Sequence, residues 1–472
     1  MPRTTLSPLD FSMPNSYSHE SLFFKTTSHS SKCIDTLKQA LQATCTLIPI
    51  FNGKLAIDPN GRPPVIFHGQ YSVQKMLTVH NFADSVDYQD LKSACLHPEA
   101  ERSIAIREAV RLLSAVPPYS LQSNGEAPVS RLTVAILRGG LAMTINFHHL
   151  VFDLTSIAVF LRILSAYCRG ERLSPLPAEC LSRDILPDLP KADYEHHLAA
   201  LNETIKPAAI VKSETQTQEH KSGATAVEQE LASPAPPPQV SAMIHFSARA
   251  LAQLKADVTA HLDPTIGPAW ITTNDALMAL AWSCITVASP AYDTGKAGLR
   301  SPICLAINLR HRLSPPLPAD YLGAAVCAPP FSLGIGALRE AAMELKALAK
   351  LAQRIRAKVN TVDAEYVRRC FDMTSALPAD GKEKEKDETS FMPDGDVDFT
   401  MNSWAEQGAC LHNWGPDLGT VECAVRLYAR SPSVYVMPEL PNRGGLLVHT
   451  TLEGETMERL RGSELWGRYA TW

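Results

Sequence analysis

The sequence predicts an α/β protein with two domains, and three observations lead to this prediction. The chain has 472 residues, more than one hydrophobic core normally organises, so two domains of roughly 200 residues are expected. Strand-like and helix-like segments alternate through the first part of the chain, as in a two-layer α/β domain. From about Lys206 to Gln239 the chain is rich in Pro, Ala, Ser, Thr, Gln and Glu, a composition typical of linkers. We therefore expect domains at 1–190 and 241–472, joined by a crossover at 191–240.

In the first domain, a predicted hairpin leads into a predicted helix. Arg131–Leu137 and Ala142–Phe147 read as strands on either side of the turn 138–140, which favours a β-hairpin. Leu154–Leu164 then repeats apolar residues at helical spacing. His149 is consequently expected at a strand-to-helix junction, where a side chain can face a cleft while packed structure holds its backbone.

The second domain is expected to open with a strand followed by two helices. Met243–Phe246 reads as the strand, and Ser247 is a suitable N-cap for a helix over Ala248–His261. A further helix is predicted after Thr272 and Thr273.

Composition excludes several classes of protein. The chain has no stretch of about 18 apolar residues and no signal-peptide pattern at its start, so we expect a cytoplasmic protein. The formal net charge of -5 and the absence of a basic block argue against nucleic acid or an anionic membrane as a partner. The eleven cysteines are scattered, without zinc-ligand spacing, which indicates reduced thiols and no metal site.

The segment 147–153 carries a His-x-x-x-Asp pattern formed by His149 and Asp153. A neutral imidazole near pH 7 is suited to general base catalysis. An isolated histidine of this kind could also be a hydrogen-bonded core residue, and Asp153 could be read as the orienting acid of a triad. Side chains alternate along a strand, so His148 should point away from His149 and play a structural or pocket-supporting role.

Blocks spread over almost the full chain resemble segments of the BAHD acyltransferases, in the order of that family. Besides His149 and Asp153, they are 6–10, 47–55, 272–277, 308–310, 315–323, 402–404 and 413–419. The long crossover, the Leu418-Gly419 variant and the Pro-rich second domain are similar to the fungal secondary-metabolite O-acetyltransferase branch.

The resemblance implies a fold and an activity. Two domains of the chloramphenicol acetyltransferase type, with mixed β-sheets and flanking helices, would enclose a channel at their interface. An acyl group, most simply from acetyl-CoA as co-substrate, would pass to a hydroxyl of a secondary metabolite without a covalent enzyme intermediate. No permanently bound cofactor or metal is implied, and we expect a monomer.

The resemblance also assigns roles to residues. His149 would be the general base, and the indole N–H of Trp404 would hold the oxyanion, with a possible contribution from the amide of Asn402. In the family the aspartate of the motif pairs with an arginine, here Asp153 with Arg310, so Asp153 would be structural.

Contacts to coenzyme A are implied near Thr272, Thr273 and Ser403. A helix N-terminus favours an anion, so the two threonines could precede a phosphate or pantetheine site. Helix capping alone explains these threonines equally well.

Four residues depart from the family pattern, and two other functions stay open. Asn413 and Trp414 replace the acid and the aromatic of the Asp-Phe-Gly loop, Leu154 replaces a glycine, and Ala324 replaces an asparagine. A stand-alone condensation-type amide synthase shares the His-His-x-x-x-Asp pattern but takes its acyl group from a carrier protein. A binding homologue that has lost catalysis is the other alternative.

Overall fold

The computed structural model describes residues 2–11, 13–26, 28–56, 65–96, 102–116, 126–186, 239–293, 298–375, 398–427, 432–439 and 444–472. Almost all of the crossover expected at 191–240 lies outside these residues. Within the described ranges, no helix is both long and apolar enough to cross a membrane.

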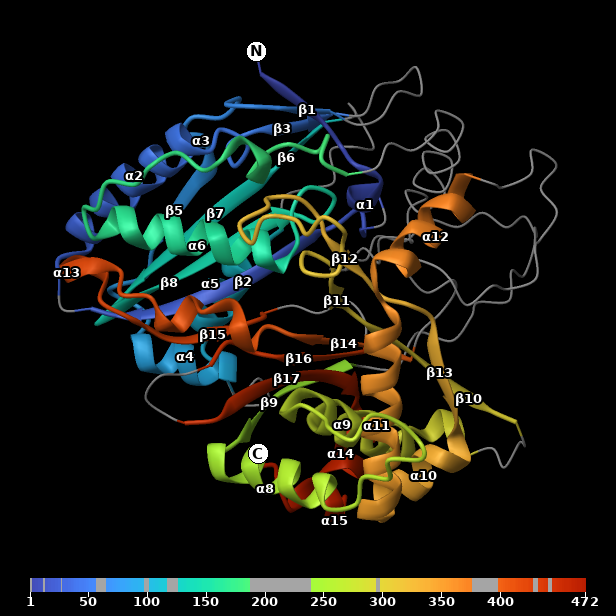
Figure 1. The fold of residues 1–472 in the computed structure, drawn as a ribbon. Helices are drawn as coiled ribbons and strands as arrows, with labels where there is room; N and C mark the ends of the chain where they lie inside the picture. Colours follow the sequence, from blue (N-terminus) through green and yellow to red (C-terminus); the bar gives the residue numbers. More distant parts are fainter. Residues whose placement is uncertain are drawn as a thin grey trace, which may run out of the picture.

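A five-stranded sheet organises the N-terminal half (Figure 1). Its order is β15-β2-β8-β7-β5, with bounds β2 Tyr17–Lys25, β5 Leu77–Asn81, β7 Ser130–Leu137, β8 Gly140–His148 and β15 Val421–Val425. The predicted hairpin is confirmed, since β7 and β8 pair antiparallel from Ser130 opposite Phe147 to Leu137 opposite Gly140. Glycine suits position 140 because a Cβ there would lie 2.5 Å from the carbonyl oxygen of Phe24. β8 is buried along its whole length.

Strand β15 comes from the second predicted domain but completes the first sheet. It pairs antiparallel with β2, with Val425 opposite Ser21 and a register shift between Val421 and Cys423. The limits of the first sheet therefore do not coincide with the predicted domain 1–190.

A second, small sheet and several helices surround the first sheet. The small sheet has the order β1-β4-β3-β6, with bounds Arg3–Thr5, Val65–Phe67, Lys54–Ala56 and Glu126–Pro128. The helices are α1 Pro8–Phe11, α2 Ser30–Leu47, α3 Val73–Met76, α4 Tyr88–Leu96, α5 Ile104–Leu113, α6 Leu154–Cys168 and the 3-10 turn η2 Ala178–Cys180.

A mixed six-stranded sheet organises the C-terminal half in the order β13-β10-β14-β16-β17-β9. Its bounds are β9 Gln239–Phe246, β10 Arg300–Leu305, β13 Phe331–Gly334, β14 Phe399–Ser403, β16 Ser433–Val436 and β17 Leu446–Glu453. The central strands β10, β14 and β16 are parallel, and the outer pairings are antiparallel. A two-stranded ladder joins β11 Ile307–Asn308 to β12 Val326–Cys327.

Helices cover this second sheet (Figure 1). They are α8 Ala248–Thr259, α9 Thr273–Ala288, α10 Ile335–Met343, α11 Leu345–Thr361, α14 Gly454–Arg461 and α15 Glu464–Gly467, with the 3-10 turn η3 Pro290–Tyr292. The C-terminal half also contains α12 Ala364–Ser375, α13 Gly415–Leu418 and the 3-10 turns η4 Ala405–Gln407 and η5 Ala409–Leu411, of which α13 lies against α2 and α6 of the first half. The predicted cap of α8 is confirmed, because the Ser247 hydroxyl accepts a hydrogen bond from the N–H of Ala250 at 3.1 Å. Helix α9 is apolar on nearly every face and accordingly buried.

The two main sheets meet through a shared hydrophobic core. Trp404, Met437 and Leu447 come from the C-terminal half but pack in the core of the first sheet. In Figure 1, β14, β16 and β17 lie beside β15 and β2. Mixed sheets with flanking helices confirm the predicted fold class.

Candidate active site

His149 lies directly after strand β8, in the turn that leads into helix α6. Its backbone N–H donates to the carbonyl oxygen of Ser16 at 2.7 Å, which fixes the turn against the segment before β2. The imidazole is half-buried and lines a cavity of about 610 Å³. A side chain on a packed turn of this kind keeps its position while its ring faces a ligand.

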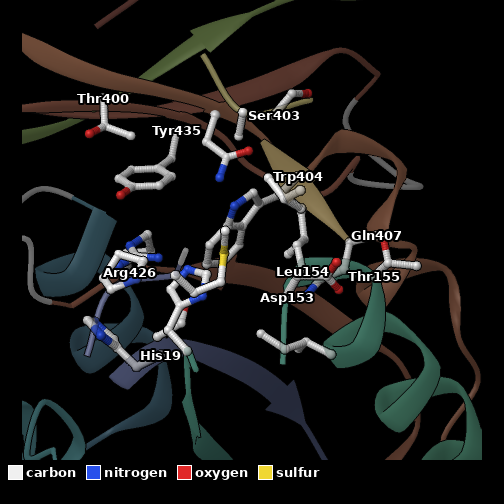
Figure 2. Close-up of a pocket in the computed structure, with 18 of the residues that line it drawn as sticks. His19, Asp153, Leu154, Thr155, Thr400, Ser403, Trp404, Gln407, Arg426 and Tyr435 are labelled. Atoms are coloured by element: carbon white, nitrogen blue, oxygen red, sulfur yellow. The ribbon is translucent and has the colours of Figure 1, made fainter. Parts of the chain in front are cut away.

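The cavity takes its lining from both halves of the chain (Figure 2). It lies where the end of β8 and the start of α6 approach β14, β15 and β16. Its volume of about 610 Å³ is typical of pockets that enclose small molecules. The lining includes Tyr17, His19, His149, Asp153 and Leu154 from the N-terminal half and Asn402, Ser403, Trp404, Arg426 and Tyr435 from the C-terminal half.

The environment of His149 keeps its imidazole uncharged. Burial is the largest effect and lowers its pKa, and the positive charge of Arg426 acts in the same direction. A backbone hydrogen bond and the carboxylate of Asp153 raise the pKa, but it stays below its ordinary value. At neutral pH the ring can therefore accept a proton. Its Nδ1 atom is buried and has no hydrogen-bond partner among the described residues.

His148 lies in a different environment from its neighbour. Its side chain is fully buried and does not belong to the cavity lining. Burial lowers its pKa to about 3, and its ring packs edge-on against Tyr17 with 4.9 Å between the ring centroids. This placement is compatible with the supporting role predicted for His148, which stays a prediction.

Asp153 caps helix α6 and forms a buried ion pair with Arg310. Its Oδ1 accepts hydrogen bonds from the backbone N–H and the hydroxyl of Ser156, both at 3.0 Å. Arg310 donates to both carboxylate oxygens, at 2.7 and 2.9 Å, and the N–H of Ala325 donates to Oδ2 at 3.0 Å.

Burial by itself would raise the pKa of Asp153, but the ion pair and the backbone donors hold it below its ordinary value. The carboxylate is therefore charged and engaged with donors other than the His149 ring. This geometry is that of a structural pair rather than a triad.

Trp404 places an unpaired donor at the cavity. Strand β14 ends at Ser403, and the backbone N–H of Trp404 donates to the carbonyl oxygen of Val436 at 2.7 Å. The indole is 3% exposed, and its Nε1 atom is buried without a hydrogen-bond partner among the described residues. Asn402 and Ser403 also line the cavity, and both are half-buried. The segment predicted to hold the oxyanion thus faces the same space as His149.

Thr272 and Thr273 do not line this cavity. Thr272 is the N-cap of α9 and forms a complete capping box with Asp275. Its hydroxyl oxygen also accepts a hydrogen bond from Arg356 at 3.1 Å, and Arg356 forms an ion pair with Asp275. The geometry of Thr272 is accounted for by capping, and the coenzyme contacts predicted for both threonines stay a prediction.

Sequence reasoning did not identify Arg426, which follows strand β15 and lines the cavity. Its guanidinium carbon lies 4.2 Å from the ring centroid of Tyr435 and 4.8 Å from that of Trp404. The arginine stands in no recognisable motif, and only the pairing of β15 with β2 brings it here. In the sequence, the nearest block that resembles the family is 413–419.

Glu20, on strand β2, is a second residue that the sequence did not indicate. It is 1% exposed and accepts a hydrogen bond from the Nε2 atom of Gln407 at 2.7 Å. Burial raises its pKa to about 7, against the opposing effects of Gln407 and the positive charge of Arg426. Glu20 therefore titrates near neutral pH beside the cavity.

The variant loop 413–419 lies away from the cavity lining. The side-chain oxygen of Asn413 accepts a hydrogen bond from the N–H of Gly415 at 2.8 Å. Gly415 adopts a φ of +87°, and a Cβ there would lie 2.6 Å from the carbonyl oxygen of Cys168. Trp414 is fully buried against Phe24. Both departures are thus accommodated by local packing.

The other two departures lie closer to the site. The backbone N–H of Ala324 donates to Asp10 at 2.9 Å, a contact that needs no particular side chain. Leu154 lines the cavity, on the side of Asp153 and Trp404 in Figure 2. A leucine here places a side chain at the cavity wall, where a glycine would have none.

Comparisons with known proteins agree with this geometry. The family model described as Transferase family matches residues 107–464, more than half of the chain. The chain belongs to the BAHD acyltransferase family. It is therefore an enzyme that transfers acyl groups, in agreement with the expectation from sequence.

Individual relatives in this family are distant in sequence. O-acetyltransferase ptmV of Penicillium ochrochloron is 24% identical over 75% of this chain and 74% of its own length. Trichothecene 3-O-acetyltransferase TRI101 of Fusarium sporotrichioides is 25% identical over 74% of this chain and 69% of its own length. The crystal structure of the latter with coenzyme A and T-2 aligns with 100% of this chain and 99% of that chain, at a TM-score of 0.67 and 20% identity.

Proposed function

We propose that this BAHD protein is a coenzyme A-dependent O-acyltransferase that takes acetyl-CoA and acylates a hydroxyl of a secondary metabolite. Two relatives are named O-acetyltransferases, and the solved TRI101 structure contains coenzyme A together with T-2. The cavity of about 610 Å³ is large enough for a small-molecule acceptor.

One observation carries the proposal: His149 and Trp404 line the same cavity, and each has a buried ring nitrogen without a partner among the described residues. A buried N–H without an acceptor is unfavourable by about 1–3 kcal/mol. The Trp404 indole therefore favours a ligand oxygen in the cavity, and His149 supplies an uncharged ring to remove a proton.

The reaction follows from these two side chains. His149 takes the proton of the acceptor hydroxyl while the oxygen attacks the thioester carbonyl carbon and forms the new C–O bond. The Nε1–H of Trp404 donates to the negatively charged oxygen of the tetrahedral intermediate. The C–S bond then breaks, and protonated His149 returns the proton to the departing thiolate. The thioester is already activated, so the enzyme needs no covalent intermediate.

In this proposal, other residues of the site support His149 and Trp404. The Asp153–Arg310 pair holds the start of α6 against the segment 323–325, and Ser403 and Asn402 shape the cavity beside Trp404. We further propose that the enzyme works as a cytoplasmic monomer, for which its composition is the only support.

The experiment is a thiol-release assay with purified enzyme, acetyl-CoA and pooled hydroxylated metabolites. We expect release that depends on both substrates and is lost in His149→Ala. Absence of thiol release from every pool, together with absence of coenzyme A binding, would overturn the proposal. Transfer from a carrier-protein thioester but not from acetyl-CoA would instead identify a condensation-type enzyme.

A further inference from the structure

The cavity contains an arginine, Arg426, that forms an ion pair with no acidic side chain of the described residues. Within the described ranges, Arg426 forms no hydrogen bond or ion pair, and its Nε atom is buried without a partner. An arginine keeps its charge in a protein, and an unpaired charge is unfavourable in a partly buried site. The arginine is therefore suited to pairing with a ligand.

The carboxyl group expected to compensate this charge is engaged elsewhere. Glu20 lies on β2, which pairs with β15 directly before Arg426, but its hydrogen bond goes to Gln407. Burial also raises the pKa of Glu20 to about 7, so its carboxyl group is only partly ionised at neutral pH. Glu20 thus leaves much of the charge of Arg426 unmatched.

The neighbouring histidines add no second charge. Burial lowers the pKa of His19, His149 and His449, and the positive charge of Arg426 contributes in each case. All three rings are uncharged at neutral pH. The lining also includes the exposed carboxylate of Glu406, so the positive charge is local to Arg426, where it matches a singly charged anion better than a phosphate dianion.

The orientation of Arg426 leaves its donors available. The guanidinium lies over the rings of Tyr435 and Trp404, and in Figure 2 it stands between Tyr435 and His19 on the side of the cavity opposite Leu154. Aromatic rings can hold the planar group by cation–π contact while its N–H edges stay free. A planar guanidinium edge suits the two oxygens of a carboxylate.

We propose that Arg426 binds a carboxylate of the acceptor, so that the substrate class is hydroxylated monocarboxylic acids. This inference rests on the proposed function, because an acetyl group brings no anion to the reaction centre and the acceptor must then supply it. Binding through Arg426 would fix the orientation of the acceptor hydroxyl toward His149.

The test compares hydroxy acids with their methyl esters and primary amides, using acetyl-CoA. For wild-type enzyme we expect kcat/KM to be at least tenfold higher for the acid than for its ester. Arg426→Gln should reduce this acid-to-ester ratio at least tenfold, mainly through KM for the acid, and Arg426→Lys should retain part of it. Arg162→Gln is the matched control, because Arg162 is exposed and pairs with Asp320.

The outcomes separate the two proposals. An acid-to-ester ratio at or below one in wild type, or equal losses for acid and ester in Arg426→Gln, would overturn the carboxylate assignment. A parallel arm pairs neutral alcohols with malonyl-CoA and acetyl-CoA. A preference for malonyl-CoA that is lost in Arg426→Gln would place the anion on the acyl group and overturn the assignment to the acceptor. Absence of thiol release with neutral and acidic acceptors alike would count against the proposed function itself.

Discussion

Replacing Asp153 with asparagine removes one charge from a buried ion pair while preserving the size of the side chain. Asp153 is 0% and Arg310 is 1% exposed, and Arg310 donates to both oxygens of the carboxylate. In the variant, the amide NH₂ of the asparagine would face a guanidinium N–H or a backbone N–H, donor against donor. Removing one partner of a buried pair costs about 3–5 kcal/mol. We expect a loss of this size in the free energy of unfolding.

Urea unfolding followed by tryptophan fluorescence measures this change. Arg310→Gln should cause a comparable loss, and the double variant should be less destabilised than the sum of the single variants by about 0.5–3 kcal/mol. Asp320→Asn is the matched control. Asp320 pairs with Arg162 on the surface, and we expect its replacement to change stability by less than about 1 kcal/mol.

The same variant distinguishes a structural aspartate from a triad acid. Loss of the aspartate from a serine hydrolase triad lowers kcat by about 10⁴ while the structure stays intact. Asp153 engages Arg310 and the start of α6, so folded Asp153→Asn enzyme should keep more activity than this. Unchanged stability combined with a loss of about 10⁴ in kcat would refute the structural role.

Two substitutions in the cavity lining and one beside the cavity give further tests. Trp404→Phe removes the indole N–H and should lower kcat by about 10²–10³ with little change in KM; an unchanged kcat would contradict the oxyanion role. Leu154→Ala should widen the cavity and raise kcat/KM for butyryl-CoA relative to acetyl-CoA, so a lower ratio would argue against contact with the acyl group. The pKa of Glu20 is raised from 4.5 to about 7 in the folded protein. As the pH rises through this range, the unfolded chain loses the proton before the folded chain does, so the free energy of unfolding falls by about 3 kcal/mol. Glu20→Gln should remove this fall, measured by urea unfolding at pH 5 and 7.5, and identical pH dependence in both proteins would contradict it.

Local patterns were sufficient to predict the elements that carry His149. The hairpin of β7 and β8 depends on strand patterning around a Gly-Gly turn, and α6 depends on apolar spacing after Asp153. These signals come from residues close together in the chain, so the sequence alone reveals them. The cap of α8 by Ser247 is predictable for the same reason.

The surroundings of the site depend on contacts between distant segments. Arg426 reaches the cavity because β15 joins a sheet built mainly by the N-terminal half, with a register shift in the pairing. Neither the pairing partner nor the shift leaves a local pattern in the sequence. At Thr272 the local pattern is present but has two interpretations, because a threonine that precedes a helix can cap it or bind an anion. The distant Arg356, which the pattern does not reveal, completes the capping arrangement.

The most direct test of general base catalysis by His149 is the rate of thiol release from acetyl-CoA in His149→Ala, compared with wild type on one accepted hydroxyl substrate. General base catalysis contributes about 10²–10⁴-fold, so the account predicts a loss of at least about 10²-fold in kcat with unfolding stability retained. A folded His149→Ala enzyme that releases thiol at the wild-type rate would contradict it.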